Sequence, residues 1–199
     1  MSMMAETYML QALQQGIASI QQNTAQLTTI LDALSPQELA SAQNYFKTAK
    51  ITIAPGFPQQ QTDMPFIGVT LATAQQSTQR TPIGWTSQTI DNGDGTSTEV
   101  MGIVFDGVIK ATIYTPNADV IVWLSEVVTW SLAVFASIFW NAGFGNVEIG
   151  MGDYEPSPDF LPVITFARGV TLSATWLKSF ALPSVNNITQ ASIDVIPLE

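Results

Sequence analysis

The sequence predicts an α+β fold in which a mainly antiparallel sheet packs against a long apolar helix and follows a helical N-terminal segment. Three observations support this fold class. Residues 120–140, VIVWLSEVVTWSLAVFASIFW, are apolar almost all the way round a helix and carry one charge, Glu126. Apolar residues between 4 and 34 recur mostly three and four positions apart, which is typical of a helix. Most of the remaining chain consists of β-rich runs bounded by Gly, Pro, Asn and Asp.

The helical N-terminal segment is predicted to contain two helices. The first covers residues 4–34, and its polar side is made of Gln, Asn, Ser and Thr, so we expect it to lean on another element. Ser35, Pro36 and Glu38 then form the capping-box pattern, with Ser35 as the N-cap and proline at the first helical position. The second helix is therefore expected to run from there to about residue 49.

The β-rich part begins after Lys50. Strands are expected at residues 51–53 and 66–71, on either side of a proline-rich stretch that cannot be helical. The clearest hairpin has its tip at residues 91–95, DNGDG, which supply positions tolerant of positive φ, and its return arm continues to about Thr115. Later strands are expected at 147–151, 162–168 and 170–177, the last two either separate or one long strand bulged at Gly169.

The apolar helix is expected to begin at a cap formed by Asn117 or Asp119 and to end at the glycines of residues 141–145. An apolar circumference requires burial in lipid, in the chain's own core or between subunits. Glu126 and the absence of Lys or Arg near either end argue against a membrane span, which stays the alternative. We therefore expect a core helix, whose inward positions include Trp123, Val127, Trp130 and Val134.

The pattern divides the chain into an N-terminal helical segment (1–50), an α+β ring-forming domain (51–182) and a C-terminal arm (183–199). The N-terminus lacks a basic region followed by an uninterrupted apolar run, so we expect synthesis in a cytosol without export.

Composition excludes several classes of function. Six Lys and Arg against 16 Asp and Glu give a formal charge of −10, which repels phosphate backbones and argues against specific nucleic-acid binding. Without histidine or cysteine, the chain has no imidazole base, thiol nucleophile or usual zinc site. We therefore expect no enzyme, no cofactor and no metal. Charged residues make up 11% of the chain, against roughly 25% in an ordinary domain, which indicates that partners cover much of the surface.

Two acidic segments contain residue types that could form a site. Residues 91–95 lack the ligand spacing of an EF-hand, because the third and fifth positions from Asp91 are glycines. Asp153, Glu155 and Asp159 lie in a proline-rich loop, and a carboxylate-based hydrolase built on them is a further alternative. We expect both segments to be solvated loops.

The order of elements resembles that of the tail terminator and neck proteins of tailed bacteriophages. The resemblance covers residues 45–182: a proline-rich extended entry (ITIAPGFPQQQTDMPFIGVTLAT), a glycine-tipped hairpin, a strand ending at Pro-Asn, a long helix, a short strand, an acidic proline loop and a closing strand (FLPVITFARGVTLSATWL). A tail-tube or head-completion subunit is the alternative within the same class.

This resemblance implies a structural virion protein that forms a homo-oligomeric ring, six-fold in such families, at the neck where the tail is terminated and joined to the head. Its partners would be copies of itself and other neck, tail-tube or sheath proteins, with DNA sliding through an acidic channel without specific binding and with no membrane or cofactor. Exposed loops and β-arms are what such rings interlock with. The expected contact residues are Asp91, Asn92, Gly93, Asp94, Gly95, Arg80, Asp153 and Glu155.

Overall fold

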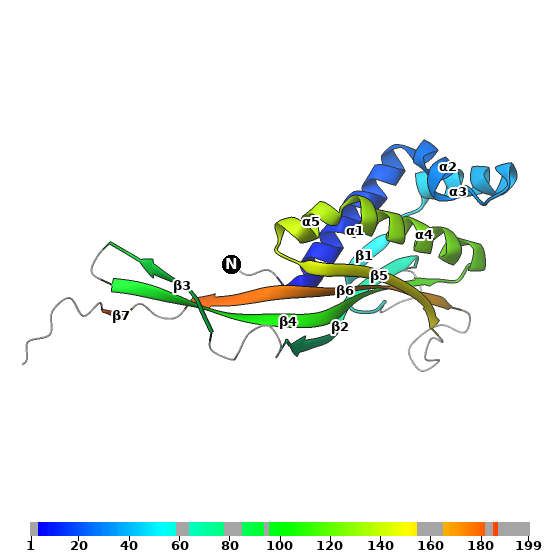
Figure 1. Cartoon of the computed structure of the whole chain (residues 1–199). Helices are drawn as coiled ribbons and strands as arrows, with labels where there is room; N and C mark the ends of the chain where they lie inside the picture. The colour runs from blue at the N-terminus through cyan, green and yellow to red at the C-terminus, as the bar shows by residue number, and fades with distance from the viewer. Residues whose placement is uncertain are drawn as a thin grey trace, which may run out of the picture. The chain divides into compact units, whose positions relative to one another are not determined.

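A computed structural model describes residues 4–58, 64–77, 85–93, 96–154, 165–181 and 185–186. The fold is α+β with a mostly antiparallel sheet, as expected (Figure 1). The helical elements are α1 (Ala5–Gln22), the 3-10 helix η1 (Thr24–Gln26), α2 (Leu27–Ile30), α3 (Pro36–Thr48), α4 (Ala118–Val134) and α5 (Ala136–Asn141). The strands are β1 (Thr52–Pro55), β2 (Phe66–Gln76), β3 (Trp85–Asp91), β4 (Thr96–Thr115), β5 (Gly145–Tyr154), β6 (Phe166–Ala181) and β7 (Val185–Asn186).

The sheet has the strand order β1-β2-β4-β6-β5, and β3 and β7 each pair with β4. β1 and β2 run parallel, whereas β5 is antiparallel to β6, with Met151 opposite Val170 and Gly152 opposite Gly169. Of the two expected arrangements for the closing strands, one long strand, β6, is observed, and it passes through Gly169 without a break.

The chain divides into two compact units, of which the first comprises residues 1–75 and 105–176. In this unit the helices lie together on one face of the sheet (Figure 1). The core between them is made of fully buried apolar side chains from α1, α4 and the strands, for example Leu13, Leu124, Ile109 and Leu172. Helix α1 therefore packs against other elements, as expected.

Helices α1 and α4 approach one another closely at Gly16. A Cβ atom built on Gly16 would lie 2.0 Å from the Ser131 side-chain oxygen and 2.3 Å from its Cβ. No residue larger than glycine fits there without moving one of the helices. This contact fixes the separation of the two helices over the sheet.

The prediction of a single helix over residues 120–140 is wrong, because α4 ends at Val134 and α5 begins at Ala136. Phe135 between them has φ −95° and ψ 22°, and its carbonyl accepts a short-range bond from Ile138 N at 3.0 Å. Serine and threonine hydroxyls also bond to backbone carbonyls within α4, from Ser125, Thr129 and Ser131, and such bonds often bend helices. Apolar periodicity alone does not reveal such a break.

Capping residues determine where the N-terminal helices begin and end. The capping box at Ser35 and Glu38 is present and starts α3 as expected. The first helix is shorter than expected, because Asn23 leaves the helical conformation (φ −140°, ψ 82°) and its side chain accepts a hydrogen bond from Ala25 N. A short 3-10 helix and α2 complete the segment that the sequence pattern assigns to one helix.

Asn117 is the N-cap of α4, and this gives a first testable prediction. Its side-chain oxygen accepts hydrogen bonds from Asp119 N at 2.8 Å and Val120 N at 3.3 Å. We expect Asn117→Ala to lower the free energy of unfolding by about 1 kcal/mol, because two backbone donors lose their acceptor. Urea denaturation checks this. Asn117→Asp keeps the acceptor and serves as the control; an equal loss in both variants would show that the cap does not matter.

The second unit comprises residues 76–104 and 177–199. Its described part contains the hairpin of β3 and β4, with Asp91 opposite Ser97 and Ile90 opposite Thr98, and the short pairing of β7 with β4. The hairpin and its long return arm to Thr115 are confirmed. The arm that we expect after residue 183 lies outside the described residues, apart from Val185 and Asn186.

Candidate interaction surfaces

Apolar side chains remain exposed on the outer side of the helical layer. On α4, Val122 is 40% exposed and Val134 53% exposed, and Ala133 beside it is also exposed. On α5, Trp140 is 65% exposed. We call these four residues the outer stripe. Val122 and Ala133 lie about three helical turns apart on one side of α4, and exposed apolar side chains on one side of a helix can mark a contact surface.

Trp140 is held by a rigid turn. Its neighbour Phe139 is fully buried and packs edge-on against Phe144, with ring centroids 5.7 Å apart. The backbone closes after the helix through Phe144 N to Phe139 O and Gly143 N to Trp140 O, both 3.0 Å, with Gly143 at φ +82°. This is the glycine-containing helix end that the sequence predicts. The exposed indole is therefore carried on a fixed backbone.

The ring of Phe144 continues an aromatic cluster onto the sheet. It stacks on Trp176 of β6 at 5.7 Å and meets Tyr8 of α1 edge-on at 5.5 Å. Trp176 in turn stacks on Phe105 of β4 at 6.2 Å. The turn that presents Trp140 is thus anchored to α1 and to two strands.

Strand β5 ends the strand order among the described residues. Ile149 is 39% exposed and Met151 47% exposed on it, although both alternate with polar or glycine positions as in a half-buried strand. An edge strand with exposed apolar side chains can accept another chain.

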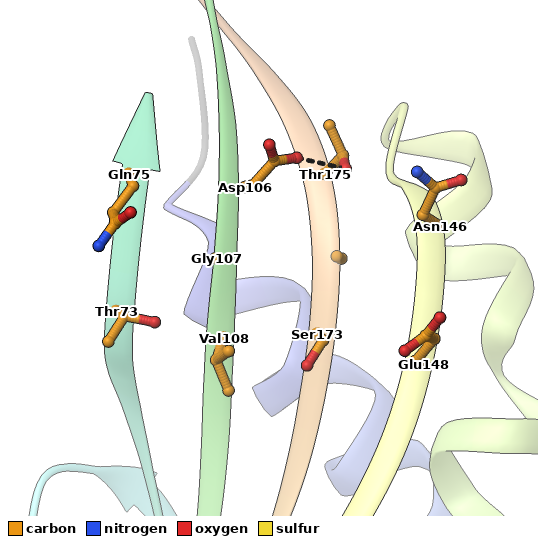
Figure 2. A pocket seen from close by; sticks show the side chains of 10 residues that line it. Thr73, Gln75, Asp106, Gly107, Val108, Asn146, Glu148, Ser173 and Thr175 are labelled. Atoms are coloured by element: carbon orange, nitrogen blue, oxygen red, sulfur yellow. Dashed lines mark hydrogen bonds between the residues drawn. The ribbon is translucent and has the colours of Figure 1, made fainter. Parts of the chain in front are cut away.

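A concave region lies on the sheet face that the helices leave open. Its volume is about 410 Å³, and it is lined by residues of β2, β4, β5 and β6: Thr73, Gln75, Asp106, Gly107, Val108, Asn146, Glu148, Ser173, Ala174 and Thr175. Figure 2 shows these side chains along four neighbouring strands, with helices behind them. We call this region the strand groove.

Two local features shape the strand groove. Asn146 has φ +49°, and the pairing of β5 with β6 shifts register between Gly145 and Glu148, so a bulge redirects the start of β5. Gly107 permits close packing of the strands, because a Cβ there would lie 2.5 Å from Thr73 O and from the Trp176 ring. Across the groove floor, the buried Thr175 donates a hydrogen bond of 2.7 Å to Asp106 (Figure 2).

An ion pair connects the end of β5 to β6 and α4. Arg168 bonds to Asp153 through its Nε atom, and its NH1 group lies 3.2 Å from Ser125 Oγ. The hydrogen bond from Arg168 holds the pKa of Asp153 below its ordinary value, because it stabilises the charged carboxylate. Asp153 therefore has a structural partner within its own chain.

This ion pair predicts a small pH dependence of stability. Since the folded-state pKa of Asp153 is lowered, its contribution is present above the unfolded-state pKa of about 4 and is lost as the pH falls through the lower folded-state value. We expect the unfolding temperature of the Asp153→Asn variant to fall less than that of the wild type as the pH is lowered through this range, measured by thermal unfolding at a series of pH values. Asp119→Asn, on the exposed first turn of α4, is the control. If Asp153→Asn leaves the pH dependence of the unfolding temperature unchanged, the ion pair does not contribute to stability as proposed.

The expected contact residues are dispersed. Asp91, Asn92 and Gly93 lie at the hairpin tip in the second unit, whereas Asp153 lies at the end of β5 in the first. The tip is ordered by its own bonds, from Gly93 N to Asp91 Oδ1 and from Asn92 Nδ2 to Thr96 Oγ1, both 2.9 Å. Four further expected contacts, Arg80, Asp94, Gly95 and Glu155, lie outside the described residues, as does Asp159 of the hydrolase alternative.

Of the expected core-helix positions, Val127 is fully buried, and Trp123 and Trp130 are half-buried against the core. Trp123 packs edge-on against Tyr45, and Trp130 against Phe135. Val134, by contrast, is the last residue of α4 and is 53% exposed, because the helix breaks after it.

Sequence reasoning missed the strand groove and Trp140. The groove depends on which strands are neighbours, which the alternation of residues does not specify. For Trp140 a signal existed: it immediately precedes the Asn-Ala-Gly helix end, where a helix leaves the core.

In the parts of the chain that the structure describes, no cluster of three or more carboxylates is arranged to hold a metal ion. Within the same residues, no helix is both long and apolar enough to cross a membrane.

No model of a known protein family matches the sequence, and no curated protein matches it. Among solved structures, the fold is similar to the sheath/tube terminator of an extracellular contractile injection system, PVC, determined by cryo-EM in its extended state. The likeness has a TM-score of 0.31 and 12% identity, and it covers 83% of this chain and 65% of that one. The chain therefore spans less than two thirds of the length of the terminator that it resembles, and the likeness by itself assigns no function.

Proposed function

We propose that this chain is a non-catalytic structural subunit that assembles with copies of itself into a ring, six-fold in the simplest case, at the end of a phage tail. The ring would terminate the tail and join it to the head, so that the protein would be part of the virion. The order of elements in the sequence suggests this class, and the outer stripe supports self-association.

The outer stripe carries the proposal. Between Val120 and Val147 the only charged residue is Glu126, although the chain as a whole has a formal charge of −10. Two copies of so acidic a chain repel one another wherever carboxylates meet, so a surface nearly free of charge is where they can approach most easily. Trp140, the most exposed residue of the stripe, is the residue type that most often anchors such contacts.

The hairpin tip is proposed as a second contact, between rings or with a tail-tube or sheath protein. In the described part of the tip, hydrogen bonds from Gly93 N to Asp91 Oδ1 and from Asn92 Nδ2 to Thr96 Oγ1 reduce the conformational entropy that is lost when it docks. The acidic balance of the chain suits a channel through which DNA passes without binding. The tip and the outer stripe make separate predictions, since they lie in different units.

Light scattering coupled to size exclusion tests the proposal. We expect the wild-type chain to elute as an oligomer whose mass falls on dilution, and Val122→Ser with Val134→Ser to shift it to the monomer. Ser substitutions at the exposed Gln14 and Gln15 of α1 are the matched control and should leave the mass unchanged. A wild-type chain that stays monomeric at the highest concentration would refute the proposed function.

Replacement of the hairpin tip, residues 92–95, by a two-residue turn tests the second contact. We expect rings to form but infectious particles to be lost. Normal particle yield with the shortened tip would show that the tip makes no essential contact.

A further inference from the structure

We propose that the contact between copies is heterologous: Trp140 of one copy inserts into the strand groove of the next. This inference rests on the proposed function, because it names the surfaces that would join the subunits. It places the helical layer of one copy against the open sheet face of its neighbour.

The projecting side is preorganised. Trp140 is 65% exposed, while Phe139 and Phe144 on either side of it are buried and fix the turn. An indole held in this way loses little freedom on binding, and an aromatic side chain buries about 150–250 Å² when it is enclosed. Trp140 therefore has the properties of an anchor residue.

The receiving side has matching size and chemistry. The strand groove is an open depression whose volume, about 410 Å³, is sufficient to receive one indole side chain. Val108 gives the groove an apolar side chain, and the exposed carboxylate of Glu148 can accept the indole N–H. An indole is compatible with these carboxylates, because it offers one N–H donor and no acceptor that they would repel.

Charge selects the helical layer as the surface that approaches the groove. Asp106 and Glu148 give the groove negative charge, and a copy that presented its own carboxylates there would be repelled. The segment from Val120 to Val147 presents Glu126 alone. The outer stripe therefore brings few carboxylates to the acidic groove.

The geometry has a consequence for assembly. The outer stripe and the strand groove are different surfaces of one chain, so each copy uses both and the contact does not pair a surface with itself. Such head-to-tail contacts generate a closed ring or an open helix. The proposed function requires that these contacts close into a ring.

Cysteine cross-linking tests this contact, because the natural chain contains no cysteine. One variant carries Asn141→Cys, beside Trp140, and a second, enlarged by a fused tag, carries Ser173→Cys in the groove. The two are mixed and treated with a short bis-maleimide. We expect a 141–173 link between differently sized chains. A Gln14→Cys variant in place of Ser173→Cys is the control, and we expect it to give none.

Trp140→Ala supplies the second readout. In the Asn141→Cys background it should lower the yield of the 141–173 link by at least about tenfold, which corresponds to the loss of an anchor residue. Its thermal unfolding should not change, which separates loss of contact from loss of fold.

The outcomes separate the two proposals. Rings that form without a 141–173 link, or that survive Trp140→Ala, overturn this inference and leave the proposed function standing. A 141–173 link in open chains that never close supports the contact and contradicts the ring. A wild-type chain that is always monomeric overturns both.

Discussion

Gly16→Ala should destabilise the chain by about 3 kcal/mol or more, the largest effect expected from adding a single methyl group. The new Cβ would lie 2.0 Å from Ser131 Oγ, much closer than van der Waals contact allows. The clash involves the side chain of Ser131 on the neighbouring helix α4. Since α1 and α4 both pack on the sheet, neither can move without opening the core. Urea denaturation followed by circular dichroism measures the change.

Ser131→Gly provides the matched test of this explanation. It removes both side-chain atoms that the new Cβ meets and leaves the Ser131 Cα at 3.2 Å. By itself it should cost about 1 kcal/mol, as glycine does inside a helix. In combination with Gly16→Ala the loss should be clearly smaller than the sum, because the clash is gone. Strict additivity of the two substitutions would contradict the close contact, and Gln15→Ala on the exposed side of α1 should have little effect.

Phe139→Ala should lower the free energy of unfolding by about 3–5 kcal/mol, because Phe139 is fully buried and its ring packs against Phe144. Truncation leaves a cavity between α5 and the core. The adjacent Trp140→Ala removes a larger side chain from the surface and should change stability by less than about 0.5 kcal/mol.

These two neighbouring residues therefore separate folding from assembly. Phe139→Ala should lose stability, whereas Trp140→Ala should keep it and lose contact between copies. The reverse order of stability effects, measured in the same denaturant series, would show that the buried and exposed sides of α5 have been assigned wrongly.

The local features of the fold could be predicted because they depend on a few neighbouring residues. The capping box at Ser35 needs only residues 35–38, and at the hairpin tip Gly93 adopts the positive φ, +77°, that the turn requires. The burial of Val127 follows from helical periodicity. Each of these signals depends on residues that are close together in the sequence.

Features that depend on distant residues were not predicted. The break at Phe135 lies within an unbroken apolar run, so periodicity alone gave it no marker. The contact between Gly16 and Ser131 joins residues that are far apart in the sequence, and the strand groove requires the neighbours of β4 to be known. Polarity and a loop position indicate the expected contact residues, and neither property indicates an exposed tryptophan at the end of an apolar helix.

Negative-stain electron microscopy of the purified wild-type chain tests the central claim most directly. The account predicts closed rings with a countable number of subunits in class averages, and single featureless particles in the Trp140→Ala variant. Wild-type images that contain only monomers, or only two-fold dimers in which each copy uses the same surface, would contradict it.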